Sequence, residues 1–546
     1  MEAPFAEVLH TCMLYTTISE ANRLSETCSV LNRGVDAAGD WAEIAFTRCV
    51  RYPADPPDPP IRPWRVVCGL HERLWNAWRG RPHLHQVTVR DELRHDGLSN
   101  LDVLIVEFLA GEDAIVLGHS HGHLSVWEFR SPRPQDGETA LDAFVLGTLQ
   151  TSGSFDVQDL HVCPSAASEP FALMLGRSVW LAAAVGPAVY IWESAGCARK
   201  SRQAAALKDW TPRGALCHAP LFPRDFHTVW AVRLCEANHD WRIALTVGED
   251  GVLRGWRFGH GDTGTLAWQF DVGDARQVIV SPLSPPSRGE GRGLAAVARA
   301  DHRSLQLLDV DTGEVTDSIY SVWPDMAGSL PVSATCGACA NMALFSSITE
   351  RGDGALSGVD LRTHLDTSRG QPWAVSNAGG PCICTSPRCT CSACDCAARW
   401  ETSQMEVEPI VGSLAGPGRV LWFALPVPAV KALVAIISDG TPSKSLEVWE
   451  SSAVRGPGSG AACFRGKVPS FAGNPHLVAV GGRRIVLLNP RALLDKGKLN
   501  VLEWRPRRRT AEQAVSSRGT RGILAYFGQM CACGVLGCYG GVLRSL

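Results

Sequence analysis

The chain has 546 residues, of which 45% are hydrophobic and 20% are charged, and this composition is typical of a protein with a well-buried core. The formal net charge of −3 excludes the broad excess of Lys and Arg that general nucleic-acid binding needs. Glu2 and Glu7 lie where a secretory signal carries basic residues, so no such signal is expected. The 20 cysteines do not form an even disulfide framework, which favours a reducing compartment, the cytoplasm or the nucleus.

Residues 4–48 are expected to form three short amphipathic helices. Val8 and Leu9 share a helical face with Met13, and apolar residues around Leu24 recur at helical spacing. Two interpretations stay open for this region. It is either a helical cap over one end of the protein or a module that binds a partner through its apolar face.

A proline-rich stretch, Pro53–Pro63, is predicted to be a stiff spacer, because Pro-rich chain holds itself extended. His85–Val89 then alternates apolar and polar residues in the manner of a short strand.

Seven short apolar segments, here called repeat words, end in an aromatic or acidic closing pair. They are HLSVWEF, AVYIWES, VLRGWRF, SLQLLDV, ALSGVDL, SLEVWES and RIVLLNP. Four of them contain a Trp, at positions Trp127, Trp192, Trp256 and Trp449. Several follow an apolar strand and a tight turn such as Asp250-Gly251, because Gly accepts the positive φ of such turns. The pattern predicts copies of one supersecondary unit.

The spacing of the repeat words predicts a ring of β-sheets. Their closing residues lie 39 to 90 residues apart, at Trp127, Trp192, Trp256, Leu308, Val359, Trp449 and Leu488. The pattern resembles a divergent WD40 β-propeller over roughly Leu101–Asn500, in which each blade takes about 40–45 residues. We predict an all-β fold with seven blades, with six and eight as alternatives. Either His85–Val89 or Gly522–Phe527 is expected to close the ring.

The segment in front of the repeats resembles an F-box. Its elements stand in the family's order, as Pro4-Phe5, Glu7–His10, Cys28–Arg33 and Trp41. The opening is Ala3-Pro4 rather than Leu-Pro, and Leu31 stands where a Trp is common. Trp64–Cys68 and Glu72–Arg81 are similar to the linker that F-box/WD40 proteins place before their propeller.

The resemblance implies a division of the chain into four parts. Residues 1–50 are a small α-helical F-box-like domain, and residues 51–83 are the spacer and linker helix. Residues 84–504 are the WD40-like propeller, with a Cys-rich insertion at about 377–399. Residues 505–546 are a basic, Gly-rich tail that is a second candidate for closing the propeller.

The resemblance also implies a function without chemistry of its own, that of substrate receptor in a cullin-type ubiquitin ligase. The first helices would bind a Skp-family adaptor, and the cullin complex through it. The adaptor-binding residues are then Pro4, Phe5, Val8, Leu9, Leu24, Val30 and Leu31. The propeller would bind a target protein, and Arg side chains on one face would pair with a phosphorylated segment if the target carries one. Arg254 and Arg257 border a repeat word. No nucleic acid and no membrane is expected as a partner.

Two other functions remain as alternatives. The first is a WD40 scaffold that joins proteins without a ubiquitin role. The second is a serine hydrolase, because Gly118–Gly122 matches the G-x-S-x-G pattern around Ser120. That pattern is a nucleophile elbow only between a strand and a helix, and a strand is predicted to follow it here. We therefore predict a hairpin turn at Ser120.

A dense group of cysteines is the one candidate metal site in the sequence. It comprises Cys382, Cys384, Cys389, Cys391, Cys394 and Cys396. Four thiolates suffice for a tetrahedral zinc ion, but the paired C-x-x-C knuckles of zinc modules are missing. A reduced, Cys-rich insertion without metal is the alternative, and no other cofactor is expected.

Val420–Ile437 is the most hydrophobic stretch of the chain. Pro426, Pro428 and Lys431 interrupt it. Two strands joined by a turn therefore explain it better than a membrane-spanning helix.

Overall fold

The structure is a computed structural model that describes one helix and the strands and turns after it. The described residues are 64–78, 80, 82–89, 101–109, 113–130, 141–151, 154–163, 178–194, 210–218, 227–236, 241–259, 264–273, 278–283, 294–299, 304–320, 331–339, 342–349, 354–360, 408–409, 420–427, 432–438, 444–450, 464–467, 477–488 and 498–505. The expectations for residues 1–63, for the cysteine group and for the tail beyond residue 505 lie outside these residues.

The chain divides into two compact units, each considered by itself. The first comprises residues 1–49, 63–77 and 505–546, and its described element is the helix α5 (Trp64–Trp78) as far as Ala77. This helix lies where the sequence predicts the linker helix. The second unit comprises residues 50–62 and 78–504, and it contains the strands.

Antiparallel strands follow one another in sets of four; five of the sets are separate sheets, and the first and last sets are joined into one eight-stranded sheet. The first two sets are β2 (Val103–Phe108), β3 (Ala114–His119), β4 (His123–Arg130) and β5 (Asp142–Gln150), then β6 (Val157–Cys163), β7 (Val179–Val185), β8 (Ala188–Ser194) and β9 (Trp210–Cys217). The next two are β10 (Val229–Glu236), β11 (Trp241–Gly248), β12 (Val252–Gly259) and β13 (Thr265–Asp271), then β14 (Val278–Leu283), β15 (Leu294–Arg299), β16 (Ser304–Asp309) and β17 (Val315–Tyr320).

Three further sets complete the described strands. They are β18 (Pro331–Cys339), β19 (Met342–Thr349), β20 (Gly354–Asp360) and β21 (Glu408–Pro409), then β22 (Val420–Val427), β23 (Ala432–Ser438), β24 (Lys444–Glu450) and β25 (Phe464–Lys467), and finally β26 (Leu477–Val480), β27 (Arg484–Leu488), β28 (Lys498–Glu503) and β1 (His83–Val89). The sequence order is thus broken only in the last set, whose fourth strand comes from the other end of the unit.

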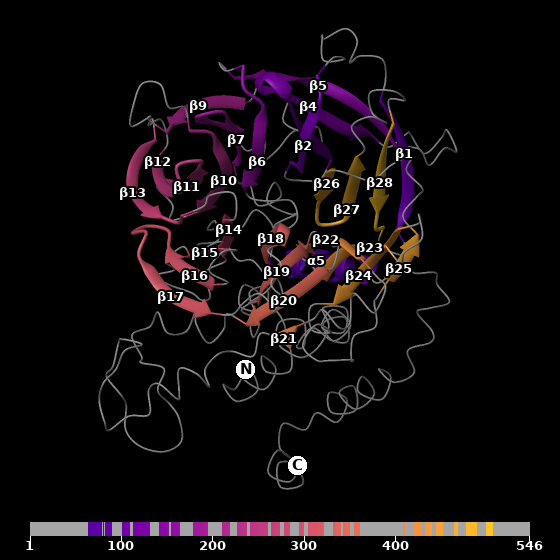
Figure 1. Cartoon of the computed structure of the whole chain (residues 1–546). Helices are drawn as coiled ribbons and strands as arrows, with labels where there is room; N and C mark the ends of the chain where they lie inside the picture. Colours follow the sequence, from indigo (N-terminus) through magenta and orange to yellow (C-terminus); the bar gives the residue numbers. More distant parts are fainter. Residues whose placement is uncertain are drawn as a thin grey trace, which may run out of the picture. The chain divides into compact units, whose positions relative to one another are not determined.

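The first strands of successive sets contact one another around a centre, as Figure 1 shows. β2 contacts β6, β6 contacts β10, and the series continues through β14 and β18 to β22, while β26 contacts β2. The second unit is therefore an all-β propeller, as the sequence predicts, with seven four-stranded sets among its described residues. Within Val420–Ile437 the structure has the two predicted strands, β22 and β23. Of the described helical segments, none is long and apolar enough to cross a membrane.

A register shift recurs where the repeat words close. In the pairing of third and fourth strands it falls at Trp127, Trp192, Trp256 and Leu308. All four side chains are buried. A bulge bends the strand and re-aims its side chain, and here it accompanies a large apolar group in the core between sets.

The seventh repeat word is assigned to the wrong strand by the sequence pattern. RIVLLNP forms β27, the second strand of the last set, whereas the other six words form third strands. The third strand is β28, which runs into the fully buried Trp504. The pattern misleads because every residue of β27 is buried, so no alternation distinguishes it from a third strand.

The propeller closes through β1, which pairs antiparallel with β28 from His83↔Glu503 to Thr88↔Lys498. Of the two candidate closing strands, His85–Val89 is the one that pairs with the last set, while Gly522–Phe527 lies outside the described residues. In Figure 1 the indigo β1 lies beside the yellow β28. Trp78 reinforces the closure, because its ring stacks on Trp504 with centroids 4.1 Å apart. Its indole N–H also donates to the carbonyl oxygen of Gly482.

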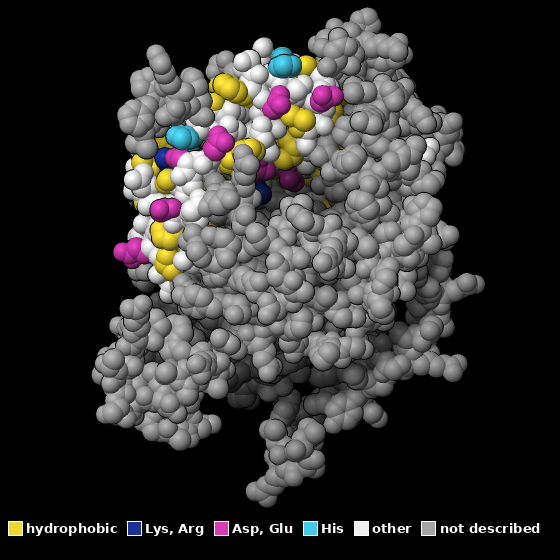
Figure 2. All heavy atoms as spheres, viewed as in Figure 1, with side chains coloured by type: hydrophobic (Ala, Val, Ile, Leu, Met, Phe, Trp, Pro, Cys, Tyr) yellow, Lys and Arg dark blue, Asp and Glu magenta, His cyan; other side chains and the backbone are white. Residues whose placement is uncertain are grey.

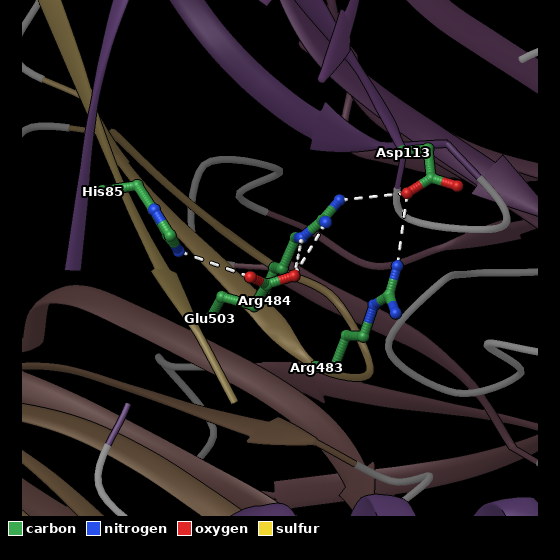
Figure 3. A network of polar contacts seen from close by, with 5 residues as sticks. All are labelled: His85, Asp113, Arg483, Arg484 and Glu503. Atoms are coloured by element: carbon green, nitrogen blue, oxygen red, sulfur yellow. Dashed lines mark hydrogen bonds and ion pairs between the residues drawn. The ribbon is translucent and has the colours of Figure 1, made fainter. Parts of the chain in front are cut away.

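A polar network lies across the same junction (Figure 3). The guanidinium of Arg484 donates to Oε1 of Glu503 at 2.8 and 3.0 Å and to Oδ1 of Asp113 at 3.1 Å. His85 of β1 lies 3.3 Å from Oε2 of Glu503, and Arg483 lies 3.2 Å from Asp113. The network therefore joins β1, β27 and β28 to the segment before β3.

Replacing Arg484 with Met is expected to lower the free energy of unfolding by about 3–5 kcal/mol, because the buried Glu503 loses its charged partner. The Arg483→Met control should cost less than about 1 kcal/mol, because the Arg483–Asp113 pair is 39% and 43% exposed. Urea unfolding of the full chain measures both variants. Equal losses in the two variants would contradict the role assigned to the buried pair.

Candidate functional site

One face of the propeller carries the turns between second and third strands and the links from each fourth strand to the next set. We call it the turn face. Its described residues are 101–102, 119–123, 151, 154–156, 186–187, 218, 227–228, 249–251 and 271–273. Backbone hydrogen bonds join neighbouring segments of this face: Val229 N–H donates to Gly186 O at 2.7 Å, and Val272 N–H donates to Gly251 O at 2.9 Å.

The segment around Ser120 is a hairpin turn, as predicted. β3 ends at His119, Ser120–Gly122 form one tight turn, and β4 begins directly afterwards. His121 has a φ of 57° and Gly122 a φ of 73°, so the chain reverses there. The strand–turn–helix context of a nucleophile elbow is not present at this serine.

This turn is held by contacts from both sides. The hydroxyl of Ser120 accepts a hydrogen bond from the backbone N–H of Asp102 at 3.2 Å, and the Ser120 N–H donates to the carbonyl of Asp102 at 2.9 Å. The N–H of His121 donates to Oδ1 of Asp156 at 3.2 Å. Asp102 and Asp156 are both exposed, and they flank the turn from two different links.

Phe155, beside Asp156, is an exposed aromatic side chain with a fixed support. It is 44% exposed, and its ring lies against Gly186 in the β7–β8 turn. A Cβ at Gly186 would lie 2.5 Å from the Phe155 ring, and the φ of this residue is +55°. Glycine is therefore needed at position 186 both for the positive φ of the turn and to leave space for the Phe155 ring.

A buried chain of hydrogen bonds supports the turn face at the third set. His218 Nε2 lies 2.7 Å from the hydroxyl of Thr246, which also accepts from the indole N–H of Trp256 at 2.8 Å. Arg254 donates to His218 Nδ1 at 2.8 Å, so the ring proton of His218 lies on Nε2 and is donated to Thr246. Burial, together with Arg254, lowers the pKa of His218 to about 4, so the ring is neutral at neutral pH.

The first set contains a similar chain. His119 Nε2 lies 2.6 Å from the hydroxyl of Ser125, which accepts from the indole N–H of Trp127 at 2.8 Å. Burial lowers the pKa of His119 to about 4. Both histidines are neutral, buried and hydrogen-bonded within the core, so they support the turns.

Arg254 is not available to a phosphate group in this arrangement. Its guanidinium pairs with Asp250 at 2.5 Å, and both side chains are mostly buried. Burial alone would raise the pKa of Asp250, but the bonds from Arg254 and from the N–H of Val252 lower it below its usual value. Arg257 lies on the same strand, β12, and its side chain is partly buried.

Charged side chains also gather on the innermost strands of the first three sets. Arg233 of β10 pairs with Asp159 of β6, and Asp159 Oδ2 also accepts from the N–H of Val232 at 2.8 Å. Glu107 of β2 accepts from the N–H of Phe108 at 3.1 Å. Burial raises the pKa of Glu107 to about 7, with Phe108 and Arg233 opposing the shift. Arg233 thus pairs with Asp159 and also acts through its charge on the pKa of Glu107.

The described turn face is acidic. Four of its carboxylates are exposed, those of Asp102, Asp156, Glu249 and Asp271, and its described residues include no Lys or Arg. In Figure 2, acidic and hydrophobic side chains lie together over the described part of the visible surface, with few Lys or Arg side chains among them. Such a surface attracts cations and repels phosphate.

The sequence-predicted adaptor-binding residues, Pro4 to Leu31, lie outside the described residues, as do the six cysteines from Cys382 to Cys396. Their roles stay predictions. Within the described ranges, no three His, Cys, Asp or Glu side chains are close enough to hold a metal ion.

Sequence reasoning did not find Phe155, Asp156 or Asp102 as surface residues of interest. Asp102 comes from one link and Phe155 and Asp156 come from another, and the hydrogen bonds at Ser120 and His121 bring the two acids to one turn. The sequence signal that could have found them is weak. It is the position of an aromatic-acid pair in the link just before a first strand.

The chain matches no family model and no curated protein. Among solved structures it is similar to Sqt1 of Saccharomyces cerevisiae, at 9% identity and a TM-score of 0.40, over 71% of this chain and 79% of that one. The β-propeller domain of Cps50 (Swd1) of Myceliophteria thermophila is similar at 11% identity and a TM-score of 0.40, over 74% of this chain and 98% of that one. A chain of the mitotic checkpoint complex is similar at 9% identity and a TM-score of 0.42, over 78% of this chain and 95% of that one. These identities and TM-scores are low, and the strand order and the contacts between first strands are what define the propeller.

Acid is expected to destabilise the protein through His218. Its pKa is about 4 when folded and about 6.5 when unfolded, so between these values the unfolded state holds more protons. The contribution of neutral His218 to the free energy of unfolding is full above pH 6.5. It falls by about 1.4 kcal/mol per pH unit as the pH drops toward 4. His218→Gln should therefore be less stable than wild type at neutral pH, by a margin that shrinks below pH 6.5.

Urea unfolding at a series of pH values measures this margin. His121→Gln, in the exposed turn, is the matched control for the same change of residue at the surface and should cost less stability than His218→Gln at neutral pH. Glu107 acts in the opposite direction, because its raised pKa makes its contribution fall as pH rises from 4.5 to about 7. The comparison of variants cancels that effect, and a margin for His218→Gln that does not change with pH would contradict the assignment.

Gly186→Ala is expected to lower the free energy of unfolding by about 2 kcal/mol or more, because the new Cβ meets the Phe155 ring and the positive φ is strained. Adding Phe155→Ala should recover part of this loss, since only the backbone strain then remains. Thermal or urea unfolding of the two variants gives the result. A double variant no more stable than Gly186→Ala would show that the Phe155 ring does not cause the loss at Gly186.

Proposed function

We propose that this chain is a non-catalytic protein-interaction subunit whose propeller binds a partner protein at its turn face. One observation carries this proposal. The described turn face presents exposed acidic and aromatic side chains on turns that hydrogen bonds hold in place, while His119 and His218 beneath them are buried and neutral. Fixed exposed side chains of this kind suit recognition, because little order is lost on binding.

We further propose that the subunit is the substrate receptor of a cullin-type ubiquitin ligase. The support is the order of F-box-like residues before the propeller, from Pro4-Phe5 through Cys28–Arg33 to Trp41. In this role Pro4, Phe5, Val8, Leu9, Leu24, Val30 and Leu31 bind the Skp-family adaptor. The receptor itself breaks no bond. It raises the local concentration of target lysines near the conjugating enzyme by tethering.

A scaffold without a ubiquitin role is the second candidate function. Its support is the propeller itself, because the exposed side chains of the turn face would serve a scaffold as well as a receptor. The cytoplasm or nucleus as compartment and the absence of a cofactor belong to both proposals.

Full-length protein carrying Leu9→Glu and Leu31→Glu is expected to lose capture of the Skp-family adaptor, because two charges enter the proposed apolar contact. Leu266→Glu is the matched control, since Leu266 is 47% exposed on β13 of the propeller. A pull-down with purified adaptor compares the three proteins. Adaptor capture by none of them, or equal capture by all, would leave the scaffold as the function.

A further inference from the structure

The Ser120 turn forms the centre of a small patch that combines exposed apolar and acidic side chains. We call it the Ser120 patch, and its members are Asp102, Leu104, Ser120, His121, Phe155 and Asp156. Leu104 is 37% exposed and Phe155 is 44% exposed, and the structure has few exposed large hydrophobic side chains among its described residues. The contacts at Ser120 and His121 fix the two acids beside them.

Leu104 is exposed because of the register of β2. Val103 pairs with His119 and Ile105 pairs with Gly118, so Leu104 is the extra residue of a bulge. The same kind of shift recurs at the second residue of β6, β10 and β18 and at the third residue of β22. Bulges re-aim side chains, and in the first set the bulge exposes an apolar group two residues from Asp102.

The acids of the patch are not both needed for the fold. Asp102 contributes only backbone atoms to the turn, and its exposed carboxylate makes none of the contacts that hold Ser120. Asp156 uses one oxygen for the N–H of His121. By contrast, the carboxylate of Asp250 pairs with Arg254 and accepts a hydrogen bond from the N–H of Val252. The carboxylate of Asp102 is therefore a negative charge on the surface without a structural role.

We propose that the Ser120 patch docks a segment of a partner protein in which basic and apolar residues alternate. This inference rests on the proposed function, and it names the chemistry of the target. The argument is charge complementarity: the exposed charges of the described turn face are carboxylates, and Arg254 is already paired. Leu104 and Phe155 supply the apolar contacts, and a phosphorylated segment is repelled.

The test uses full-length protein and fluorescein-labelled peptides of one length. The first peptide alternates Arg with Leu, the second replaces Arg with Glu, and the third replaces Arg with phosphoserine. Fluorescence anisotropy is expected to show binding of the Arg peptide alone, and the affinity should fall as salt is added. Binding of the phosphoserine or Glu peptide instead, or of none of the three, would overturn the proposal.

Variants locate the binding. Asp102→Asn with Asp156→Asn removes two charges and keeps the acceptor oxygen for His121, and it should raise the Kd of the Arg peptide about fivefold or more. Leu104→Ser should weaken binding in the same range. Glu314→Gln is the matched control, because this exposed acid lies in the β16–β17 turn, at the other end of the third strand, and its Kd should change less than about twofold.

Adaptor capture by the same variants separates this inference from the proposed function. We expect every Ser120-patch variant to capture the adaptor as wild type does. An unchanged Kd in Asp102→Asn with Asp156→Asn would overturn the patch even if adaptor capture is intact. If the wild-type protein does not capture the adaptor, the ligase role is overturned. The peptide result then still decides the Ser120 patch.

Discussion

The propeller depends on the pairing of β1 with β28, which joins strands more than four hundred residues apart in the chain. Each set buries both faces against its neighbours, so an open ring would expose the facing surfaces of the first and last sets. The core there shows the size of that surface. It takes Val87 from β1, Trp127 from β4, and Val486 and Val501 from the last set, all fully buried. Backbone pairing, the Trp78–Trp504 stack and the Arg484–Glu503 pair hold this junction together.

Closure leaves little surface for recognition. The faces of the sets are buried against neighbouring sets. The outer strands present backbone edges, which proteins usually protect from pairing with other chains. On β9 this protection is visible, because Pro212 removes a donor and Gly214, with a φ of +126°, bends the strand at a register shift. Side chains that can vary without cost to the core therefore lie mainly on turns. That is where the exposed acids and Phe155 are found.

Much of this fold could be predicted from the sequence because hairpins are local. Alternation and a Gly-containing turn predict β11 and β12 around Asp250-Gly251, and the alternation of His85–Val89 predicts the closing strand. The seventh repeat word failed because β27 is buried at every position, which removes the signal that alternation carries. The site was less predictable. Residue 218 meets residue 246, and Asp102 meets Ser120, only through tertiary hydrogen bonds that no short window of sequence contains.

The acids of the turns show why charge counts alone do not predict a binding surface. Asp309 accepts from the N–H groups of Asp311 and Thr312, and Asp250 accepts from Val252 and pairs with Arg254, so both are needed to form their turns. A carboxylate used in this way is partly neutralised and cannot be replaced freely. Asp102 differs, because the turn at Ser120 needs only its backbone N–H and carbonyl. Since any residue but proline supplies those two groups, the fold leaves the side chain at position 102 free, and a charge there acts on whatever approaches from solvent.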